Sequence, residues 1–324
     1  MRIGVVGAGA VGGTLAALLD RAGHEVAVAA RGGGLDAIRT HGLRLEGAWG
    51  AHTASVAAAE IIDSPVELLI IAVKAPDLAG AVAANRAAVG GPVLVVRNGL
   101  GAREETRRAL GGTAPVVGGL AVFAASLAAP GTVTVTAAAP LYVGGHAAAE
   151  GVAEVLGAVL PTRVADPFDG AEWTKLVVNQ VNALPAITGL SVQACIADAT
   201  LRRILTRSIR ETVDTARATG IRFARLQGLD DRLLGLVASV PEVVAEGLPR
   251  LMARRMGDVP NPGSTLQSVR RGRPTEIDWL NGAVVDTAVR AGRSAPVNAA
   301  LVELVHEVER TGRFLTPAEV RGRL

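Results

Sequence analysis

The chain has 324 residues, of which 49% are hydrophobic and 19% are charged, and its formal net charge at pH 7 is +3. This length is enough for two domains with separate cores, and no apolar run free of charges or glycines reaches the roughly 20 residues of a membrane-spanning helix. The low net charge and the aromatic content of 2% exclude the basic surface and the stacking platform of a nucleic-acid-binding protein.

The cysteine and histidine content indicates the compartment and argues against a metal site. Cys195 is the single cysteine, so an internal disulfide is excluded and a reducing, cytoplasmic location is expected. Its neighbours Ala194 and Ile196 indicate that the thiol packs in a core. The histidines never stand at metal-ligand spacing, so we expect no metal. The N-terminus lacks the basic stretch of a signal peptide and is expected to belong to the mature protein.

The first predicted strand runs from Arg2 to Val6 and leads into the motif Gly7-Ala8-Gly9-Ala10-Val11-Gly12, which a helical segment follows. In such a unit the first glycine permits a tight turn, the second lets the backbone approach a pyrophosphate, and the third lets the helix pack on the strand. Free amides at the start of the helix bind phosphate. A purely structural glycine loop is the alternative. We favour a dinucleotide site whose cofactor contacts are Gly7, Gly9, Ala10, Val11 and Gly12.

Arg31 stands directly after the second predicted strand, which spans residues 25–30. A site that prefers NAD places an acidic residue here to bind the ribose 2′-hydroxyl, whereas an arginine suits the 2′-phosphate of NADP. A solvated surface arginine is the alternative, but Asp36 stands too far along the next segment to serve the ribose. We therefore expect NADPH to be the cofactor.

Two further buried strands are predicted at residues 67–73 and 92–96, because both are continuous apolar runs of the kind found in parallel sheets. Lys74 follows the first of them, and Asn98 follows the second. Ligands of open parallel sheets bind at the carboxyl ends of the strands. We therefore expect the glycine motif, Arg31, Lys74 and Asn98 to converge on one crevice, although Asn98-Gly99 alone is an ordinary turn.

The rest of the chain divides into a β-rich part and a helical part. Strands at residues 120–125, 132–136 and 141–143 are predicted to extend the sheet in antiparallel fashion, and a helix at 150–160 and a strand at 162–165 follow. The sequence thus predicts an α/β fold, with a Rossmann-type dinucleotide-binding domain at residues 1–167 and an all-α substrate domain at residues 168–324. The helices expected in the second domain span residues 172–184, 198–219, 227–239, 241–256, 276–292 and 298–311, and Thr316 is expected to cap a last one.

The predicted helix at residues 172–184 carries a polar stripe on an otherwise apolar surface. At about 100° per residue, Lys175, Asn179 and Asn182 lie within about 60° of one another. Of the 33 basic residues only Lys74 and Lys175 are lysines, so these two positions disfavour arginine. An ammonium releases a proton far more readily than a guanidinium, which makes Lys175 a candidate general acid. The alternative is a lysine whose head reaches water from a core helix.

A loop at residues 260–267 leads through an arginine-rich stretch to Thr275-Glu276-Ile277-Asp278. On spacing alone, a helix that is capped by Thr275 and carries Glu276 in its first turn is as good an interpretation as a role in chemistry.

Taken together, these residues resemble the ketopantoate reductases, or 2-dehydropantoate 2-reductases, over nearly the full length of the chain. The matching motifs are Gly7-x-Gly9-x-x-Gly12, Arg31, Ala72-Val73-Lys74, Asn98-Gly99-Leu100-Gly101, Trp173-x-Lys175-Leu176-x-x-Asn179, and Ser264-x-x-Gln267 with Thr275-Glu276-Ile277-Asp278.

The resemblance implies an NADP-dependent oxidoreductase that reduces ketopantoate to pantoate in the biosynthesis of pantothenate and coenzyme A. It implies that Lys175 is the acid for the ketone oxygen and that Glu276 is the second catalytic residue. It also implies that Arg31 and Lys74 face NADPH, and that the substrate contacts are Asn98, Asn179, Asn182 and Ser264. A small 2-oxo acid is then the expected partner, and a homodimer is compatible with this interpretation.

Two positions depart from the family pattern. Arg97 stands where glutamine is expected before Asn98, and Asn182 follows Asn179 by three residues, whereas some members place the second asparagine four residues on. Both departures concern cofactor or substrate positions, so reduction of a different branched or hydroxylated 2-oxo acid is an alternative. A nucleotide-sensing protein without turnover is a second alternative, and the joint presence of a lysine at 175 and a glutamate at 276 argues against it.

Overall fold

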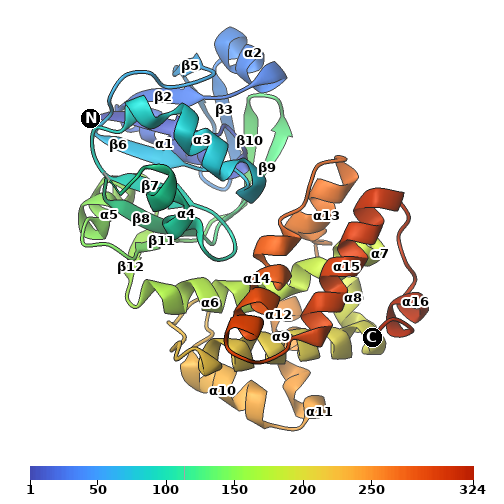
Figure 1. Cartoon of the computed structure of the whole chain (residues 1–324). Coiled ribbons are helices and arrows are strands. Elements are labelled where there is room, and N and C mark those ends of the chain that lie inside the picture. The colour runs from blue at the N-terminus through green and yellow to red at the C-terminus, as the bar shows by residue number, and fades with distance from the viewer. Residues whose placement is uncertain (113) are drawn as a thin grey trace. The chain divides into compact units, whose positions relative to one another are not determined.

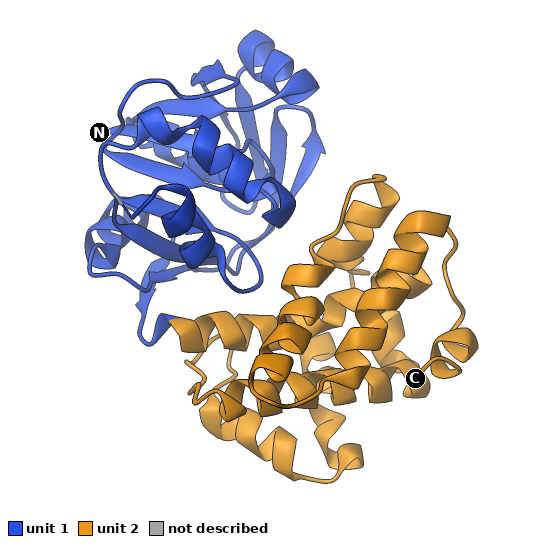
Figure 2. Ribbon diagram, in the orientation of Figure 1, with its two compact units in different colours: residues 1–168 blue, residues 169–324 orange. Residues whose placement is uncertain are grey.

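The computed structural model describes residues 1–112 and 114–324. The chain divides into two compact units, Met1–Phe168 and Asp169–Leu324, which Figure 2 shows in two colours. The first unit combines sheets with helices, and the second is largely helical (Figure 1). The predicted fold class is therefore confirmed. Within the described residues, no helix combines the length and the apolar character needed to cross a membrane.

Unit 1 is built on an eight-stranded sheet with the order β12-β11-β8-β7-β6-β1-β2-β5. All neighbouring strands are parallel except β8 and β11. Strands β6 and β7 are buried along their whole length, as expected for strands covered on both faces. The strands are β1 (Arg2–Val6), β2 (Glu25–Ala29), β5 (Ala57–Ala59), β6 (Leu68–Ile71), β7 (Val93–Val96), β8 (Val116–Ala121), β11 (Leu141–Gly144) and β12 (Thr162–Ala165).

A second sheet of four strands has the order β4-β3-β10-β9. Its strands are β3 (Leu43–Gly47), β4 (His52–Ala54), β9 (Ala124–Ala129) and β10 (Thr132–Ala137). The prediction that residues 120–143 extend the main sheet in antiparallel fashion is therefore wrong for β9 and β10, and it holds only for β11. Strand β10 pairs in parallel with β3, which the sequence did not predict as a strand, and this pairing takes the β9-β10 hairpin out of the main sheet.

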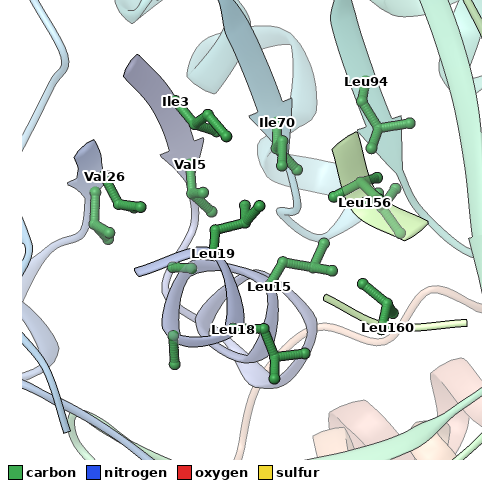
Figure 3. Close-up of a cluster of buried hydrophobic side chains, with 14 of the residues drawn as sticks. Ile3, Val5, Leu15, Leu18, Leu19, Val26, Ile70, Leu94, Leu156 and Leu160 are labelled. Atoms are coloured by element: carbon green, nitrogen blue, oxygen red, sulfur yellow. The ribbon is translucent and has the colours of Figure 1, made fainter. Parts of the chain in front are cut away.

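Helix α1 (Ala10–Arg21) packs against strands of both sheets. Its side chains Leu15 and Leu19 belong to one buried cluster with Ile3, Val5 and Ile70 of the main sheet (Figure 3). A second buried cluster joins the opposite face of the main sheet to α3 and α4. The other helices of this unit are α2 (Gly32–His41), η1 (Ala75–Asp77), α3 (Leu78–Ala84), η2 (Arg86–Ala88), α4 (Ala102–Ala109) and α5 (Ala149–Gly157).

Unit 2 contains the helices that follow, with α6 beginning at the junction of the two units. They are α6 (Phe168–Asn179), η3 (Gln180–Asn182), α7 (Ala183–Thr188), α8 (Val192–Ala197), α9 (Ala199–Ala218), α10 (Asp231–Ser239), α11 (Glu242–Ala245), α12 (Gly247–Met256), α13 (Gly263–Arg270), η4 (Ile277–Trp279), α14 (Asn281–Arg290), α15 (Pro296–Thr311) and α16 (Pro317–Arg321). Thr316 caps α16 as predicted, in a capping box with Glu319.

Three predicted helices are interrupted, and a proline explains two of the breaks; the third, in the helix predicted at residues 276–292, lies at Leu280. The helix predicted at residues 172–184 tightens into the 3₁₀ turn η3, because Pro185 has no N–H for the carbonyl of Val181 and its ring crowds that carbonyl. The helix predicted at 241–256 divides after Ala245, four residues before Pro249, for the same reason. The helix predicted from residue 227 begins only at Asp231.

Candidate active site

The turn between β1 and α1 has a geometry that requires two of its glycines. Gly7 has a φ of +101°, and a Cβ there would lie 2.6 Å from the carbonyl oxygen of Ala72. A Cβ on Gly12 would lie 1.9 Å from the carbonyl oxygen of Gly7. Gly12 therefore lets α1 start directly against the turn, and the fold itself demands glycine at both positions.

Gly9 differs, because a Cβ there would meet no protein atom within 4 Å. Its backbone is extended, a conformation open to any residue, and it immediately precedes the first helical turn, which Ala10 and Val11 begin. The amides of that turn have no acceptor within the helix. Neither packing nor backbone conformation explains a glycine here, whereas a pyrophosphate drawn close to the backbone does. This part of unit 1 therefore fits a dinucleotide.

Arg31 lies at the start of α2 with an extended backbone and an exposed side chain. The first turn of α2 consists of Gly32, Gly33 and Gly34, and a Cβ added to any of them would meet nothing within 4 Å. An exposed guanidinium beside uncovered helix amides is suited to a phosphate group.

The residues predicted to contact the cofactor all follow neighbouring strands of the main sheet. The glycine turn follows β1, Arg31 follows β2, Lys74 follows β6, and Asn98 follows β7. These four strands are adjacent and parallel, so their carboxyl ends share one edge of the sheet. Lys74 and Asn98 are half-buried there.

Arg97, the first departure from the family pattern, is buried, with a side chain that is 1% exposed. Its Nη1 donates a hydrogen bond of 2.9 Å to Glu105 Oε2 on α4, and its Nη2 donates to the carbonyl oxygen of Leu100. The guanidinium thus braces the turn that carries Asn98 from within unit 1.

Lys175 lies in α6 of unit 2 and is half-buried, next to the fully buried Leu176 and Val177. Desolvation by burial lowers the pKa of its ammonium from 10.5 to about 8. Such a lysine is still mostly protonated at neutral pH and releases its proton more readily than an ordinary one.

The 3₁₀ turn η3 changes the geometry of the polar stripe. Residues three apart in a 3₁₀ helix eclipse one another, so the turn places Asn182 in line with Asn179, and both are buried. Asn182 Oδ1 accepts a hydrogen bond of 3.2 Å from the backbone amide of Ser264, which lies exposed in the first turn of α13. The structure therefore brings Asn182 and Ser264 together.

Glu276 is half-buried and directly precedes η4. The helix predicted at residues 276–292 is interrupted, because Leu280, with φ −99° and ψ −95°, leaves the helical conformation: η4 ends before it and α14 begins after it. Thr275 Oγ1 accepts a hydrogen bond of 3.3 Å from the amide of Ile277, which is the bond expected of a capping threonine, but the turn that follows is only the short η4.

The segment that carries Glu276 is tied to α15 at two points. The amide of Thr275 donates a hydrogen bond of 2.7 Å to Glu309 Oε1. His306 joins the same carboxylate to Asp278, with Nδ1 2.6 Å from Glu309 Oε2 and Nε2 2.9 Å from Asp278 Oδ1. Partial burial alone would lower the pKa of His306, but the hydrogen bonds to both carboxylates raise it.

Two polar residues in the interior of unit 2, Gln180 and Asn281, are not among the site residues predicted from the sequence. They are hydrogen-bonded to each other across 101 positions of the chain. One signal was present: Gln180 interrupts an apolar row, four residues after Leu176 and four before Leu184.

Two stretches of the chain match the two domains of a single family. Residues 3–148 match the family described as Ketopantoate reductase PanE/ApbA, and residues 168–309 match Ketopantoate reductase PanE/ApbA C terminal. The 2-dehydropantoate 2-reductase of Pyrococcus horikoshii is 29% identical over 320 residues, which are 96% of this chain and 99% of the relative. The enzyme of the same name from Mycobacterium tuberculosis is 31% identical over 320 residues, with 94% and 96% covered.

Solved structures give the same result for the fold. A PanE/ApbA family ketopantoate reductase from Ralstonia eutropha JMP134 is similar with a TM-score of 0.83 and 29% identity, over 96% of this chain and 99% of that one. A D-mandelate dehydrogenase solved with NADH and anilino(oxo)acetate shares the fold, with a TM-score of 0.80, 22% identity and the same coverage. These matches confirm the predicted resemblance: the chain belongs to the ketopantoate reductase PanE/ApbA family of oxidoreductases.

Proposed function

We propose that this protein reduces 2-dehydropantoate to pantoate with NADPH, a step in the biosynthesis of pantothenate and coenzyme A. The observation that carries the proposal is Lys175, a half-buried lysine with a pKa of about 8 on the same helical segment as Asn179 and Asn182. Relatives of 29% and 31% identity that match nearly the whole chain are 2-dehydropantoate 2-reductases, which supports ketopantoate as the substrate.

In this proposal, unit 1 holds the dinucleotide at the edge of the main sheet. The amides of Ala10 and Val11 bind the pyrophosphate in the room that Gly9 leaves. Arg31 pairs with the 2′-phosphate, and Lys74 and Asn98 contact the cofactor further along the same edge, where Asn98 also reaches the substrate. When bound, NADPH supplies the hydride for the 2-oxo carbon.

Unit 2 supplies the proton and holds the 2-oxo acid. Lys175 Nζ donates its proton to the ketone oxygen as negative charge develops there. Glu276 is the second catalytic residue, and its carboxylate accepts hydrogen bonds from donor groups of the substrate.

The substrate carboxylate binds to Asn179, Asn182 and Ser264 in this proposal. Because Asn182 Oδ1 already accepts from the Ser264 amide, its Nδ2 is the end that donates to the substrate. The Ser264 hydroxyl is exposed at the start of α13 and donates as well.

Reduction of another 2-oxo acid is the second candidate. It is supported by the shared fold with a D-mandelate dehydrogenase that was solved with NADH, and by the two departures from the family pattern at positions 97 and 182. In this second candidate function the same residues have the same roles, and only the side chain of the 2-oxo acid substrate differs.

An assay of NADPH oxidation tests cofactor, reaction and substrate together. Ketopantoate is compared with branched, hydroxylated and aromatic 2-oxo acids, each with NADPH and with NADH. The proposal predicts that ketopantoate with NADPH gives the highest kcat/KM. A higher kcat/KM with another acid supports the second candidate, and NADPH binding without oxidation by any acid indicates a nucleotide sensor.

A further inference from the structure

Gln180 carries a fully buried amide at the point where helix α6, which contains Lys175, passes into the 3₁₀ turn η3. It is the first residue of η3 and is 0% exposed. Its Nε2 donates a hydrogen bond of 3.2 Å to the carbonyl oxygen of Leu176, one turn back along α6. Its Oε1 accepts hydrogen bonds from Ser208 Oγ at 2.6 Å and from Asn281 Nδ2 at 2.8 Å. Every one of these contacts lies within unit 2.

Asn281 carries the contact to the segment that holds Glu276. It is the first residue of α14 and is 0% exposed. The four residues between Glu276 and Asn281 form a compact turn, in which the carbonyl oxygen of Glu276 accepts hydrogen bonds from the amides of Trp279 and Leu280 at 3.0 and 3.1 Å. Because this turn is short and held by its own hydrogen bonds, a displacement of Asn281 is expected to displace Glu276 as well.

Further buried groups fix the position of Asn281. Its Nδ2 also lies 2.9 Å from Asn298 Oδ1. Asn298 Nδ2 in turn donates a hydrogen bond of 2.7 Å to Glu211 Oε2. The Glu211 carboxylate accepts from the amides of Val297 and Asn298 as well, both at 2.9 Å, and so anchors the first turn of α15.

The network of Gln180, Asn281 and Asn298 could serve stability alone. Its location beside the groups assigned to the reaction argues against this interpretation. A buried amide left unpaired costs on the order of 1–3 kcal/mol, and apolar side chains of similar volume would pack a helix bundle without that risk. The amide nitrogens of Gln180, Asn281 and Asn298 all donate within the network, whereas Asn281 Oδ1 is buried without a partner among the described residues. Directional bonds of this kind favour one geometry, which an apolar contact does not guarantee. Here the network joins the turn between Asn179 and Asn182 to the start of α14, so the fixed geometry is that of the groups assigned to the reaction.

We propose that Gln180 is a positioning residue, which through Asn281 fixes the Glu276 segment relative to the helix of Lys175 and Asn179. The inference rests on the proposed function, because it takes these residues as the reacting groups. Gln180 itself is fully buried and is assigned no contact with the substrate. A displacement of about 1 Å between reacting groups can cost roughly a hundredfold in rate, so the network bears on turnover as well as on stability.

The test compares Gln180→Met, which keeps the length of the side chain and removes its amide, with Gln180→Glu. The glutamate keeps an oxygen that accepts from Ser208 and Asn281, and it serves as the conservative variant. Thr206→Val is the matched control: Thr206 is fully buried in α9, and its hydroxyl donates a hydrogen bond of 2.8 Å within that helix, to the carbonyl oxygen of Arg202.

The expected result is a kcat that falls roughly 10- to 100-fold in Gln180→Met, judged by the rate cost of misplacing reacting groups. The Kd for NADPH stays within twofold, and Gln180→Glu regains most of the turnover. Thr206→Val lowers the Tm but leaves kcat unchanged. If Gln180→Met loses stability like the control and keeps its kcat, the network is structural only and the inference is overturned. If Gln180→Met does not fold, Gln180→Glu and Asn281→Ser decide the question by the same readouts.

A second readout does not depend on turnover. The chain has two lysines, so ¹³C-lysine labelling gives two side-chain signals, and Lys175→Arg identifies the one from residue 175. The inference predicts that this signal shifts in Gln180→Met and Asn281→Ser but not in Thr206→Val. An unmoved signal overturns the inference, whether or not ketopantoate is the substrate. A wild-type protein that reduces no 2-oxo acid contradicts the proposed function instead.

Discussion

Asn182 and Ser264 are joined through the side chain of the first and the backbone of the second, by a hydrogen bond of 3.2 Å from the Ser264 amide to Asn182 Oδ1. Gly263 makes this approach possible: its φ is +70°, and a Cβ on it would lie 2.6 Å from the same oxygen. The oxygen of the Asn182 amide is thereby fixed at the start of α13, and its nitrogen is the end assigned to the substrate.

Asn182→Asp tests this assignment. The aspartate keeps an oxygen for the Ser264 amide and replaces the donor Nδ2 by a second, negatively charged acceptor. A hydrogen bond to a charged group contributes about 1.5–3 kcal/mol, so the KM for the 2-oxo acid is expected to rise by roughly tenfold or more, with the Tm little changed. Asn261→Asp is the control, because it adds the same charge near the start of α13, on a side chain that bonds the amide of Gly263. Equal KM values for the two variants would contradict the assignment.

Arg31→Ala tests the preference for NADPH. If the exposed guanidinium pairs with the 2′-phosphate, the variant is expected to bind NADPH more weakly by about 1.5–3 kcal/mol, the contribution of a hydrogen bond between charged groups, and to bind NADH unchanged. Fluorescence titration with both dinucleotides measures this. Arg39→Ala, at the other end of α2, is expected to leave both affinities as they are. A similar loss for both dinucleotides after Arg31→Ala would show that the arginine does not recognise the phosphate.

The two glycines of the nucleotide turn are expected to respond differently to alanine. Gly12→Ala forces a Cβ to 1.9 Å from the Gly7 carbonyl oxygen, and overpacking of this kind costs roughly 1–3 kcal/mol of stability. Gly9→Ala meets no protein atom, so its Tm is expected to stay the same or rise slightly. Its affinity for NADPH is expected to fall, because the methyl group occupies the room assigned to the pyrophosphate. Normal NADPH binding by Gly9→Ala would contradict the proposal that the pyrophosphate lies against the backbone of Gly9.

The sequence predicted best those features that depend on neighbouring residues. The strand Arg2–Val6 and its glycine turn are encoded within a dozen positions, and the apolar surroundings of Lys175 follow from one helical repeat. The break at η3 had a local signal as well, in Pro185. The parallel pairing of β3 with β10 and the bond between Gln180 and Asn281 join segments about ninety to a hundred residues apart. No local pattern specifies such a pairing, because many strands and amides in the chain offer the same groups.

The pKa of Lys175 predicts a pH dependence for the reduction. The proposed acid must be protonated, and burial lowers its pKa from 10.5 to about 8. The kcat/KM for the 2-oxo acid is therefore expected to be level below about pH 7 and to fall tenfold per pH unit above 8. The ¹³C-lysine signal of residue 175 is expected to titrate with the same midpoint. A rate that stays level to pH 10 would contradict the assignment of the acid.

The turnover of Lys175→Arg tests most directly whether Lys175 is the general acid. Lys175→Ala is expected to lower kcat by roughly 10²–10⁴, the usual contribution of a general acid, with NADPH still bound in unit 1. Arginine keeps the positive charge but does not readily release a proton. If proton donation is the function of Lys175, the kcat of Lys175→Arg should stay close to that of Lys175→Ala. A near-normal kcat in Lys175→Arg would show that the residue serves as a fixed positive charge and that the proton comes from elsewhere.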